Sequence, residues 1–474
     1  MNERSRHPIV ILGGGPAGLA AAYQLARQGW GAVTVLERGT RVGGNAGSFL
    51  LDGIPVDFGS HRLHPSCAPA LLADIKALLG ADLLDRPRHG RIRLQGRWVH
   101  FPLKPLDLAL RLPPAFAAGV IGDALTKRFA PAVEPPTFAS LLERGLGKTI
   151  CREFYFPYAQ KLWGLPPEAL DAEQARRRVA NSSLGKMVRR VLGAVPGLKP
   201  PGAGRFFYPR RGFGQIADAF AAAATGAGAE VLLQADVREV TGDGDRITGV
   251  TAVVDGQERR FPSRQVLSTI PLPVLARLVT GTGEAPPLQA TAGLGYRAMV
   301  LIYVTLEADY FTEFDAHYFP ESHIRISRMS EPKRYGLVER PGRTVLCAEL
   351  PCAFQGEEWS MSDTGLLELF RRDIETAGLG PLPPVAGIHV ERLPFAYPLY
   401  TEGYRQAFDG LDAWVSRLDG LVTFGRQGLF VHDNTHHTMA MAYALAGCLQ
   451  PSGDLDRAAW AAARKTFESN VVED

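Results

Sequence analysis

The feature that most constrains this chain is a glycine motif close to its start. A short apolar run, Ile9–Leu12, leads directly into the glycine turn Gly13–Gly18, and an alanine-rich stretch of helical character follows over Leu19–Arg27. A second apolar run, Val33–Leu36, ends at Glu37. The order strand, glycine turn, helix and strand predicts a βαβ unit of a parallel sheet, with an acidic residue at the tip of its second strand.

Each glycine of the Gly-x-Gly-x-x-Gly spacing has its own physical reason. Gly13 permits the tight turn, Gly15 lets a pyrophosphate approach the backbone, and Gly18 lets helix and strand pack closely. The helix N-terminus supplies amide donors for the phosphates. Glu37 is placed to accept hydrogen bonds from ribose hydroxyls and to repel a 2′-phosphate, which favours FAD or NAD over NADP. A glycine-rich turn without a ligand is the alternative, but every contextual condition of the dinucleotide fingerprint is met.

Composition excludes several other classes of protein. The length of 474 residues corresponds to roughly three domain-sized units. The 52 Lys and Arg residues exceed the 49 Asp and Glu residues by only three, too few for a nucleic-acid-binding protein. The five cysteines form no Cys-x-x-Cys pair, which argues against a disulfide scaffold or zinc site and predicts a reducing, cytoplasmic location. We expect no secretory signal at the polar Met1–His7, and no simple membrane span, because charges and prolines interrupt Phe101–Leu125.

The α/β character returns in three separated blocks, which predicts a discontinuous domain with another threaded through it. We expect a Rossmann-like nucleotide domain from residues 1–75, 205–275 and 410–474, and an α+β substrate domain from residues 76–204 and 276–409. Apolar patterning and turn residues predict strands at Ala229–Leu233, Val237–Val240, Ile247–Val254, Met299–Leu306, Thr344–Glu349 and Leu421–Phe424, helices at Ala70–Leu79, Phe138–Leu146 and Thr438–Gln450, and a hairpin at Arg91–Phe101.

A second glycine pair decides which dinucleotide is bound. The segment Arg41-Val42-Gly43-Gly44-Asn45 follows Glu37, and Asp57–Pro65 follows that. Plain dehydrogenases have no need of a glycine pair just after the ribose-binding acid. With these motifs the chain resembles the flavoprotein superfamily of amine oxidases, protoporphyrinogen oxidases, phytoene desaturases and UDP-galactopyranose mutases. The resemblance implies a glutathione-reductase-type domain that binds FAD, with Arg41–Asn45 running beside the cofactor.

Two later segments extend the resemblance along most of the chain. Gly212-x-Gly214 and the strands after it look like the second FAD segment, where Val237 packs near the adenine. Gly425–Phe430 looks like the third, where a helix N-terminus faces the flavin pyrimidine and stabilises negative charge. The cofactor contacts that the resemblance implies are Gly13, Gly15, Pro16, Ala17, Gly18, Glu37, Arg38, Arg41, Gly43, Gly44, Asn45, Gly59, Ser60, His61, Val237, Thr269, Gly425, Arg426, Asn434 and Thr435.

Further residues are similar to the mutase-like and protoporphyrinogen-oxidase-like branch. The loop Gly59–His64 is similar to the loop that places a histidine at the flavin, which makes His61 and Arg62 the predicted catalytic residues. A histidine that is only hydrogen-bonded within its loop is the alternative for His61. The aromatic stretch Phe154–Trp163 lines a substrate cavity or packs in the core. The predicted substrate contacts are Tyr158, Trp163, Tyr318, Arg325 and Arg328.

Other patterns are assigned no site. His432, His436 and His437 lack carboxylate or cysteine companions at metal-ligand spacing, so we expect no metal. We expect Arg176–Arg178 to be a solvated face, the alternative being an anion site. Phe101–Leu125 is expected to be a helical cap over the pocket, the alternative being an element that lies on a membrane surface.

The resemblance implies an enzyme that passes hydride from a substrate C–H bond to flavin N5, in the biosynthesis of a specialised metabolite, a lipid or a tetrapyrrole. Its partners are then a small-molecule substrate and an electron acceptor, oxygen or a quinone. The alternative is a non-redox isomerase of the sugar-nucleotide mutase type that uses reduced FAD, with arginines for an anionic leaving group. A flavin-binding module without catalysis is a third possibility.

Overall fold

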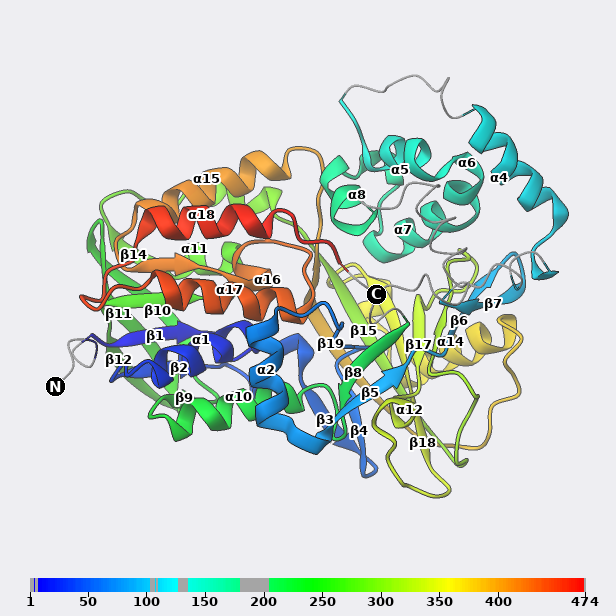
Figure 1. Cartoon of the computed structure of the whole chain (residues 1–474), viewed down its shortest axis with the longest axis horizontal. Helices are drawn as coiled ribbons and strands as arrows, with labels where there is room; N and C mark the ends of the chain where they lie inside the picture. The colour runs from blue at the N-terminus through cyan, green and yellow to red at the C-terminus, as the bar shows by residue number, and fades with distance from the viewer. Residues whose placement is uncertain are drawn as a thin grey trace.

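The computed structural model of the chain describes residues 7–102, 110–126, 135–179 and 204–472, together with Arg4 and Asp107. Within these ranges a five-stranded parallel sheet of order β20-β13-β1-β2-β9 gathers strands from three distant parts of the sequence (Figure 1). Its strands are β1 (Ile9–Leu12), β2 (Val33–Leu36), β9 (Glu230–Leu232), β13 (Gln265–Ser268) and β20 (Leu421–Thr423). The predicted βαβ unit is therefore confirmed, and it forms the centre of this sheet.

Three helices pack together beside the parallel sheet: α1 (Pro16–Arg27), α10 (Gln215–Gly226) and α17 (Thr435–Cys448). Buried alanines on α1 allow the close approach of its neighbours. Helix α17 begins at Thr435 rather than at the predicted residue 438, because Asn434 and His437 form a reciprocal cap at its N-terminus.

The second half of the molecule is built on a mixed sheet of order β19-β15-β18-β17-β16-β6-β7. The predicted strands at 299–306 and 344–349 are confirmed as parts of β15 and β18, which are almost entirely buried. The predicted hairpin is also confirmed, with Gln95 and Gly96 at φ values of 50° and 74° in its turn. The strands are β6 (Gly90–Leu94), β7 (Arg97–Phe101), β15 (Tyr296–Leu306), β16 (Ala316–Tyr318), β17 (Arg328–Ser330), β18 (Thr344–Cys352) and β19 (Val385–Pro398).

A group of helices lies above one end of this sheet and has its own apolar core (Figure 1). It comprises α4 (Pro114–Thr126), α5 (Phe138–Leu146), α6 (Lys148–Ile150), α7 (Phe156–Trp163) and α8 (Ala172–Val179), with a π-helical turn at Cys151–Tyr155. Helix α4 buries none of its side chains and lies at the outer edge of the molecule. The expectation for Arg176–Arg178 is wrong for Arg177, which is buried, while Arg176 is exposed and the Arg178 side chain lies outside the described part.

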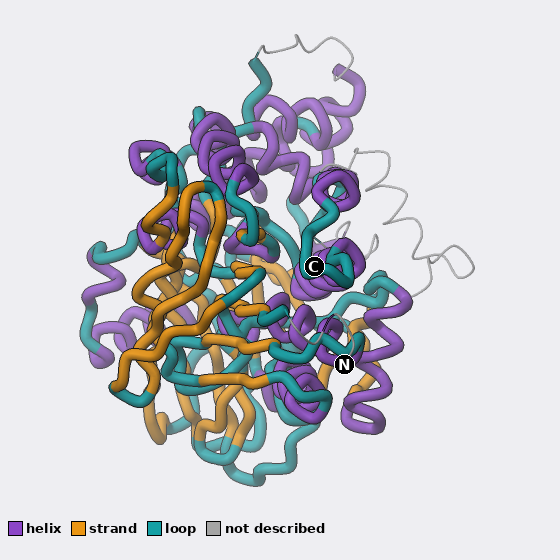
Figure 2. Tube along the Cα trace, turned by 90° about the vertical axis from the view of Figure 1, so that its left-hand side faces the viewer, coloured by secondary structure: helices purple, strands orange, loops and turns teal. Residues whose placement is uncertain are grey.

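The remaining described strands form three smaller sheets, and Figure 2 shows the strands and helices of the molecule from the side. A four-stranded sheet has the order β12-β11-β10-β14, and β3-β4 and β5-β8 are two-stranded. The bounds are β3 (Ser48–Leu51), β4 (Ile54–Asp57), β5 (Leu83–Pro87), β8 (Arg205–Pro209), β10 (Asp236–Gly244), β11 (Arg246–Val254), β12 (Gln257–Pro262), β14 (Val279–Thr282), α2 (Pro69–Leu79), α11 (Leu272–Leu278), α12 (Pro332–Gly336), α13 (Glu357–Ser360), α14 (Asp363–Thr376), α15 (Tyr404–Arg417), α16 (Gly425–Gly428) and α18 (Arg457–Phe467).

The architecture is the one that the sequence predicts: a discontinuous Rossmann-like α/β part with an interleaved α+β part. The residue limits of the two domains stay predictions. Among the described helices, none combines the length and the apolar character that crossing a bilayer requires.

Candidate flavin site

The glycine turn between β1 and α1 is shaped by its neighbours at two positions and is open at the third. A Cβ added to Gly13 (φ 99°) would lie 2.5 Å from Thr269 Oγ1, and one added to Gly18 would lie 2.0 Å from the Gly13 carbonyl oxygen. A Cβ on Gly15 would meet no atom within 4 Å. Gly13 and Gly18 are thus required by the fold itself. Gly15 borders free space at the start of α1, which fits a phosphate group approaching the backbone.

Glu37 is held at the end of β2 by backbone amides. Its Oε2 accepts a hydrogen bond from Gly14 N and its Oε1 accepts one from Gly39 N, both at 2.7 Å. The segment before Val237 runs alongside, because Ala235 N donates to the Glu37 carbonyl at 2.9 Å. The predicted ribose and adenine contacts therefore lie at the same edge of the parallel sheet. Arg38 is exposed next to them.

The second glycine pair packs against the first turn. Gly43 N donates to the Gly14 carbonyl at 2.8 Å, and a Cβ on Gly44 would lie 3.5 Å from Gly15 Cα. Arg41 places its guanidinium over the rings of Phe49 and Phe58, at 5.1 and 5.3 Å from their centroids. The structure thus brings the Arg41–Asn45 segment beside the first glycine turn, and its contact with a cofactor stays a prediction.

The third predicted segment closes on the same turn from the opposite side. A Cβ on Gly425 (φ 76°) would lie 3.0 Å from Ala17 Cβ on α1. Asn45 Nδ2 and Gln427 Nε2 both donate to the Phe395 carbonyl, at 2.9 and 2.8 Å. The first and third segments therefore meet at the end of β19. Asn434 and Thr435 begin helix α17 here.

Asp57 links the first and second segments, a role that the sequence analysis missed. The Asp57 carboxylate accepts hydrogen bonds from Phe213 N at 2.8 Å, Ser48 Oγ at 2.6 Å and Tyr208 Oη at 2.7 Å. Burial raises the pKa of Asp57 to about 6, although these three donors favour the charged form. Gly212 and Gly214, which the sequence singled out, lie against Ser48.

His61 lies in the loop after β4 and is held in its neutral form. Its Nδ1 is 3.2 Å from the Gly59 carbonyl oxygen, and its ring stacks on Phe213 with centroids 5.3 Å apart. Burial, and then the positive charges of Arg328 and Arg426, lower the pKa of His61 to about 4. An imidazole with this pKa is not a proton donor near neutral pH.

Arg62 is enclosed by hydrogen-bond partners. It donates to Tyr318 Oη and Tyr335 Oη, each at 3.0 Å, and to Asp315 Oδ1 at 3.3 Å. Its side chain is 8% exposed. Arg62 therefore carries a buried positive charge beside the His61 loop, and Asp315 compensates this charge.

Arg328 is compensated in the same manner. Its Nε and Nη2 each donate to the Glu349 carboxylate at 2.9 Å, and Ser60 N donates to Glu349 Oε1 at 2.8 Å. This pair ties the His61 loop to β17 and β18. Arg325 is not part of it, because it pairs with Glu358 at 2.5 Å near α13.

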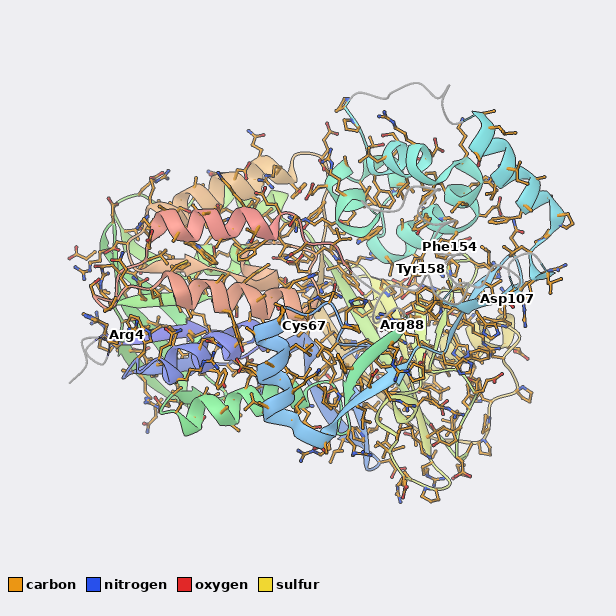
Figure 3. All side chains as sticks on the ribbon, viewed as in Figure 1. Arg4, Cys67, Arg88, Asp107, Phe154 and Tyr158 are labelled. Carbon is orange, nitrogen blue, oxygen red and sulfur yellow. The ribbon has the colours of Figure 1, made fainter. Side chains whose placement is uncertain are left out.

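Aromatic side chains of the helical group face this region. Figure 3 places Phe154 and Tyr158 on the side of the group that faces the mixed sheet. Tyr158 is half-buried and stacks on Phe154, with centroids 6.0 Å apart. Trp163 is buried in the helical core, and its ring contacts His432 edge-on at 6.3 Å. Tyr158 and Trp163 therefore lie in different surroundings. Tyr158 is on the side that faces the mixed sheet, and Trp163 contacts the third segment through His432.

The described part of the chain thus combines a parallel sheet whose glycine turn is open at Gly15, two further segments packed on that turn, and a second, mixed sheet. The chain belongs to the flavin-containing amine oxidoreductase family, whose sequence model matches residues 16–444.

Relatives in sequence cover only parts of the chain. It is 39% identical to polyamine oxidase 4 of Oryza sativa subsp. japonica over 75 residues, 16% of this chain and 15% of that protein. It is 31% identical to phytoene dehydrogenase of Streptomyces griseus over 318 residues, 59% of this chain and 57% of that protein. The chain therefore spans less than two thirds of either relative.

Solved structures resemble the fold over nearly its whole length. Reduced UDP-galactopyranose mutase has a TM-score of 0.80 at 20% identity, over 98% of this chain and 96% of that chain. A putative protoporphyrinogen oxidase from Exiguobacterium sp. 255-15 has a TM-score of 0.71 at 19% identity, over 93% and 98% of the two chains. Putrescine oxidase has a TM-score of 0.62 at 16% identity, over 93% and 98%.

Proposed function

We propose that the chain is an FAD-dependent oxidoreductase that removes hydride from a C–H bond of a small molecule. The open space at Gly15, the amide-held Glu37 and the segments that meet beside Phe395 fit an extended dinucleotide. When bound, FAD supplies the hydride acceptor at N5, and oxygen or a quinone takes the electrons onward. The chain's own task is to bind the cofactor, orient the substrate and set the charge around both.

The observation that carries this proposal is the compensation of charge around the His61 loop. Arg62 is paired with Asp315, Arg328 is paired with Glu349, and His61 is neutral near pH 7. A pocket for a diphosphate needs cations that are not already neutralised. Asp315 and Glu349 are both engaged as ion-pair partners of these arginines. Because these carboxylates are engaged in ion pairs, the arrangement fits hydride removal without a side-chain base. We infer an uncharged or weakly polar substrate position beside Tyr158 and Tyr318.

The helix that starts at Thr435 has a complementary role. The dipole of this capped helix favours negative charge at its N-terminus, which supports our proposal that the flavin pyrimidine lies at this end. Arg426 adds a positive charge next to it and is held by the Ala396 carbonyl at 2.9 Å. This arrangement favours acceptance of an electron pair.

A second candidate is an isomerase of the UDP-galactopyranose mutase type. Arg328 and Arg426 both act electrostatically on His61, so two guanidinium groups face one region. If substrate binding displaced Glu349 from Arg328, these groups would receive an anionic leaving group.

The test is to mix the oxidised holoenzyme anaerobically with a panel that comprises a polyamine, phytoene, protoporphyrinogen and UDP-galactopyranose. An oxidoreductase loses the visible absorbance of oxidised flavin with its substrate, and one oxidised product forms per flavin. A mutase keeps the visible absorbance of oxidised flavin with every compound of the panel. It isomerises the sugar nucleotide only after its flavin has been chemically reduced. The second result would overturn the proposed oxidoreductase.

A further inference from the structure

Asp433 is a buried carboxylate directly before the N-cap of α17. Its side chain is 0% exposed, and its Oδ2 accepts a hydrogen bond from Asn470 Nδ2 at 2.8 Å. Its backbone carbonyl accepts one from Arg426 Nη1 at 3.3 Å. Asp433 therefore holds Arg426 through its carbonyl and the C-terminal segment through its carboxylate, at the position directly before the N-cap of α17.

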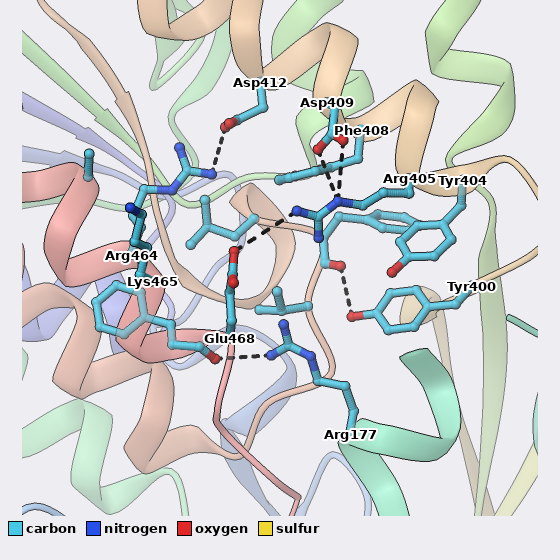
Figure 4. A pocket seen from close by; sticks show the side chains of 15 residues that line it. Arg177, Tyr400, Tyr404, Arg405, Phe408, Asp409, Asp412, Arg464, Lys465 and Glu468 are labelled. Atoms are coloured by element: carbon cyan, nitrogen blue, oxygen red, sulfur yellow. Dashed lines mark hydrogen bonds and ion pairs between the residues drawn. The ribbon is translucent and has the colours of Figure 1, made fainter. Parts of the chain in front are cut away.

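Arg177 provides the countercharge from a different part of the fold. It lies on α8, its side chain is 6% exposed, and its Nη1 is 3.6 Å from Asp433 Oδ1. The same Nη1 donates to the Phe467 carbonyl at 3.1 Å, and the Arg177 carbonyl accepts from Val472 N at 2.9 Å. Figure 4 shows Arg177 reaching from α8 toward the end of α18, near Lys465 and Glu468. One residue thus joins the helical group, the C-terminal segment and the flavin segment.

We propose that Arg177 is a positioning residue for the flavin site, which acts by compensating Asp433 and so holds Arg426 and the N-terminus of α17 in place. The proposal rests on the proposed placement of FAD against residues 425–435. A buried carboxylate that loses its cation either takes up a proton or moves toward solvent. Either change alters the field at the N-terminus of α17.

Arg177 forms an ion pair with Asp433, and His437 and Arg426 also favour the charged form of this carboxylate. A cavity of about 240 Å³ borders Arg177, and the other two arginines on that cavity's wall have carboxylate partners: Arg405 pairs with Asp409 at 3.1 Å and Arg464 with Asp412 at 2.9 Å (Figure 4). The other partner of Arg177, Glu173, keeps Arg176 at 3.4 Å. Removal of Arg177 therefore affects Asp433 most. The titratable and charged groups that face Asp433 are Arg177 on α8, Arg426 on α16, His437 on α17 and Tyr400 after β19.

The test compares full-length Arg177→Met, Arg177→Met/Asp433→Asn and the control Arg176→Met, which removes an exposed arginine from the same helix. FAD affinity and the flavin midpoint potential are measured between about pH 5.5 and pH 8. In Arg177→Met we expect the FAD dissociation constant to rise with pH, by up to about tenfold per unit, as the uncompensated Asp433 ionises. We also expect the potential to become more negative. The double variant and the control should have flat profiles within about threefold of the parent.

Each outcome decides the proposal. An Arg177→Met protein with the parent's affinity and pH profile overturns it, as does an Asp433→Asn change that rescues neither property. If Arg177→Met does not fold, Asp433→Asn is compared with the double variant, and unequal FAD affinities overturn the proposal. A parent protein that binds no FAD refutes the proposed cofactor instead, which separates the two failures.

Discussion

At the scale of single residues, Gly15 separates the needs of the fold from those of the ligand. Its added Cβ meets nothing within 4 Å, whereas that of Gly18 would overlap a backbone oxygen. We predict that Gly15→Ala changes apoprotein stability by no more than about 1 kcal/mol, the size of a cap effect. FAD affinity should fall at least tenfold, since the methyl group takes the space of the phosphate.

Thermal unfolding of the apoprotein and titration with FAD check this prediction. Gly410→Ala in α15 is the matched control, because its Cβ also meets nothing within 4 Å. It should stabilise the helix by up to about 1 kcal/mol and leave FAD affinity unchanged. Undiminished FAD binding by Gly15→Ala would contradict the assignment of the phosphate site.

Asp57 gives a residue-scale prediction about pH. Its pKa in the folded chain, about 6, lies above the ordinary 3.8, so the folded state binds more protons than the unfolded state between those values. Its contribution to stability is therefore lost as pH rises from about 4 to 6. Asp57→Asn should gain up to about 3 kcal/mol relative to the parent over that interval.

Denaturant unfolding at a series of pH values measures this difference. Tyr208→Phe should have the opposite effect and steepen the loss, because it removes a donor that favours the charged carboxylate. The contribution of His61 to stability depends on pH in the opposite direction to that of Asp57. The pKa of His61 in the folded chain is lowered to about 4, so its contribution is lost as pH falls below about 6.5. Parallel pH profiles for Asp57→Asn and the parent would show that Asp57 is not buried in charged form.

At the scale of elements, strand register creates the central ion pair. Arg328 on β17 lies directly opposite Glu349 on β18 in their antiparallel ladder. We predict that Glu349→Gln leaves a buried guanidinium uncompensated and costs about 3–5 kcal/mol of stability. Added sulfate should restore part of this loss, because the variant offers a free cation to an anion.

Unfolding temperatures with sulfate and with chloride at equal ionic strength test this. Glu358→Gln is the control, because its partner Arg325 is more exposed, and sulfate should affect it less. A Glu349→Gln protein that is indifferent to sulfate would show that Arg328 is not accessible to anions, which would also weigh against the mutase candidate.

The elements also show what the sequence could and could not predict. Glycine turns and short apolar strands are correctly predicted, because their requirements are local, such as a positive φ at Gly13. The start of α17 is not, because the Asn434 cap was not recognised in the sequence. The partners of Arg62 and Arg328 were not predicted. Arg62 reaches Asp315 across 253 positions, and the register of β17 against β18 depends on the whole sheet. Long-range pairs of this kind leave no periodic signal in one sequence.

At the scale of the whole molecule, three distant segments meet at one end of the parallel sheet, and the ion pairs Arg62–Asp315 and Arg328–Glu349 lie beside the His61 loop. The family and the fold follow from local motifs in sequence order. The charge compensation is displayed only by the folded chain, because Arg62–Asp315 joins the two parts and Arg328–Glu349 joins two strands of the mixed sheet. Arg177 is a further case of charge compensation, since this residue of the helical group pairs with the buried Asp433 beside the third segment.

The most direct test of the central claim is the count of electrons during turnover. With the oxidised holoenzyme and its substrate, the account predicts one molecule of peroxide or of reduced quinone for each molecule of product. Product formed from pre-reduced enzyme alone, with no acceptor consumed, would contradict an oxidoreductase and leave the isomerase.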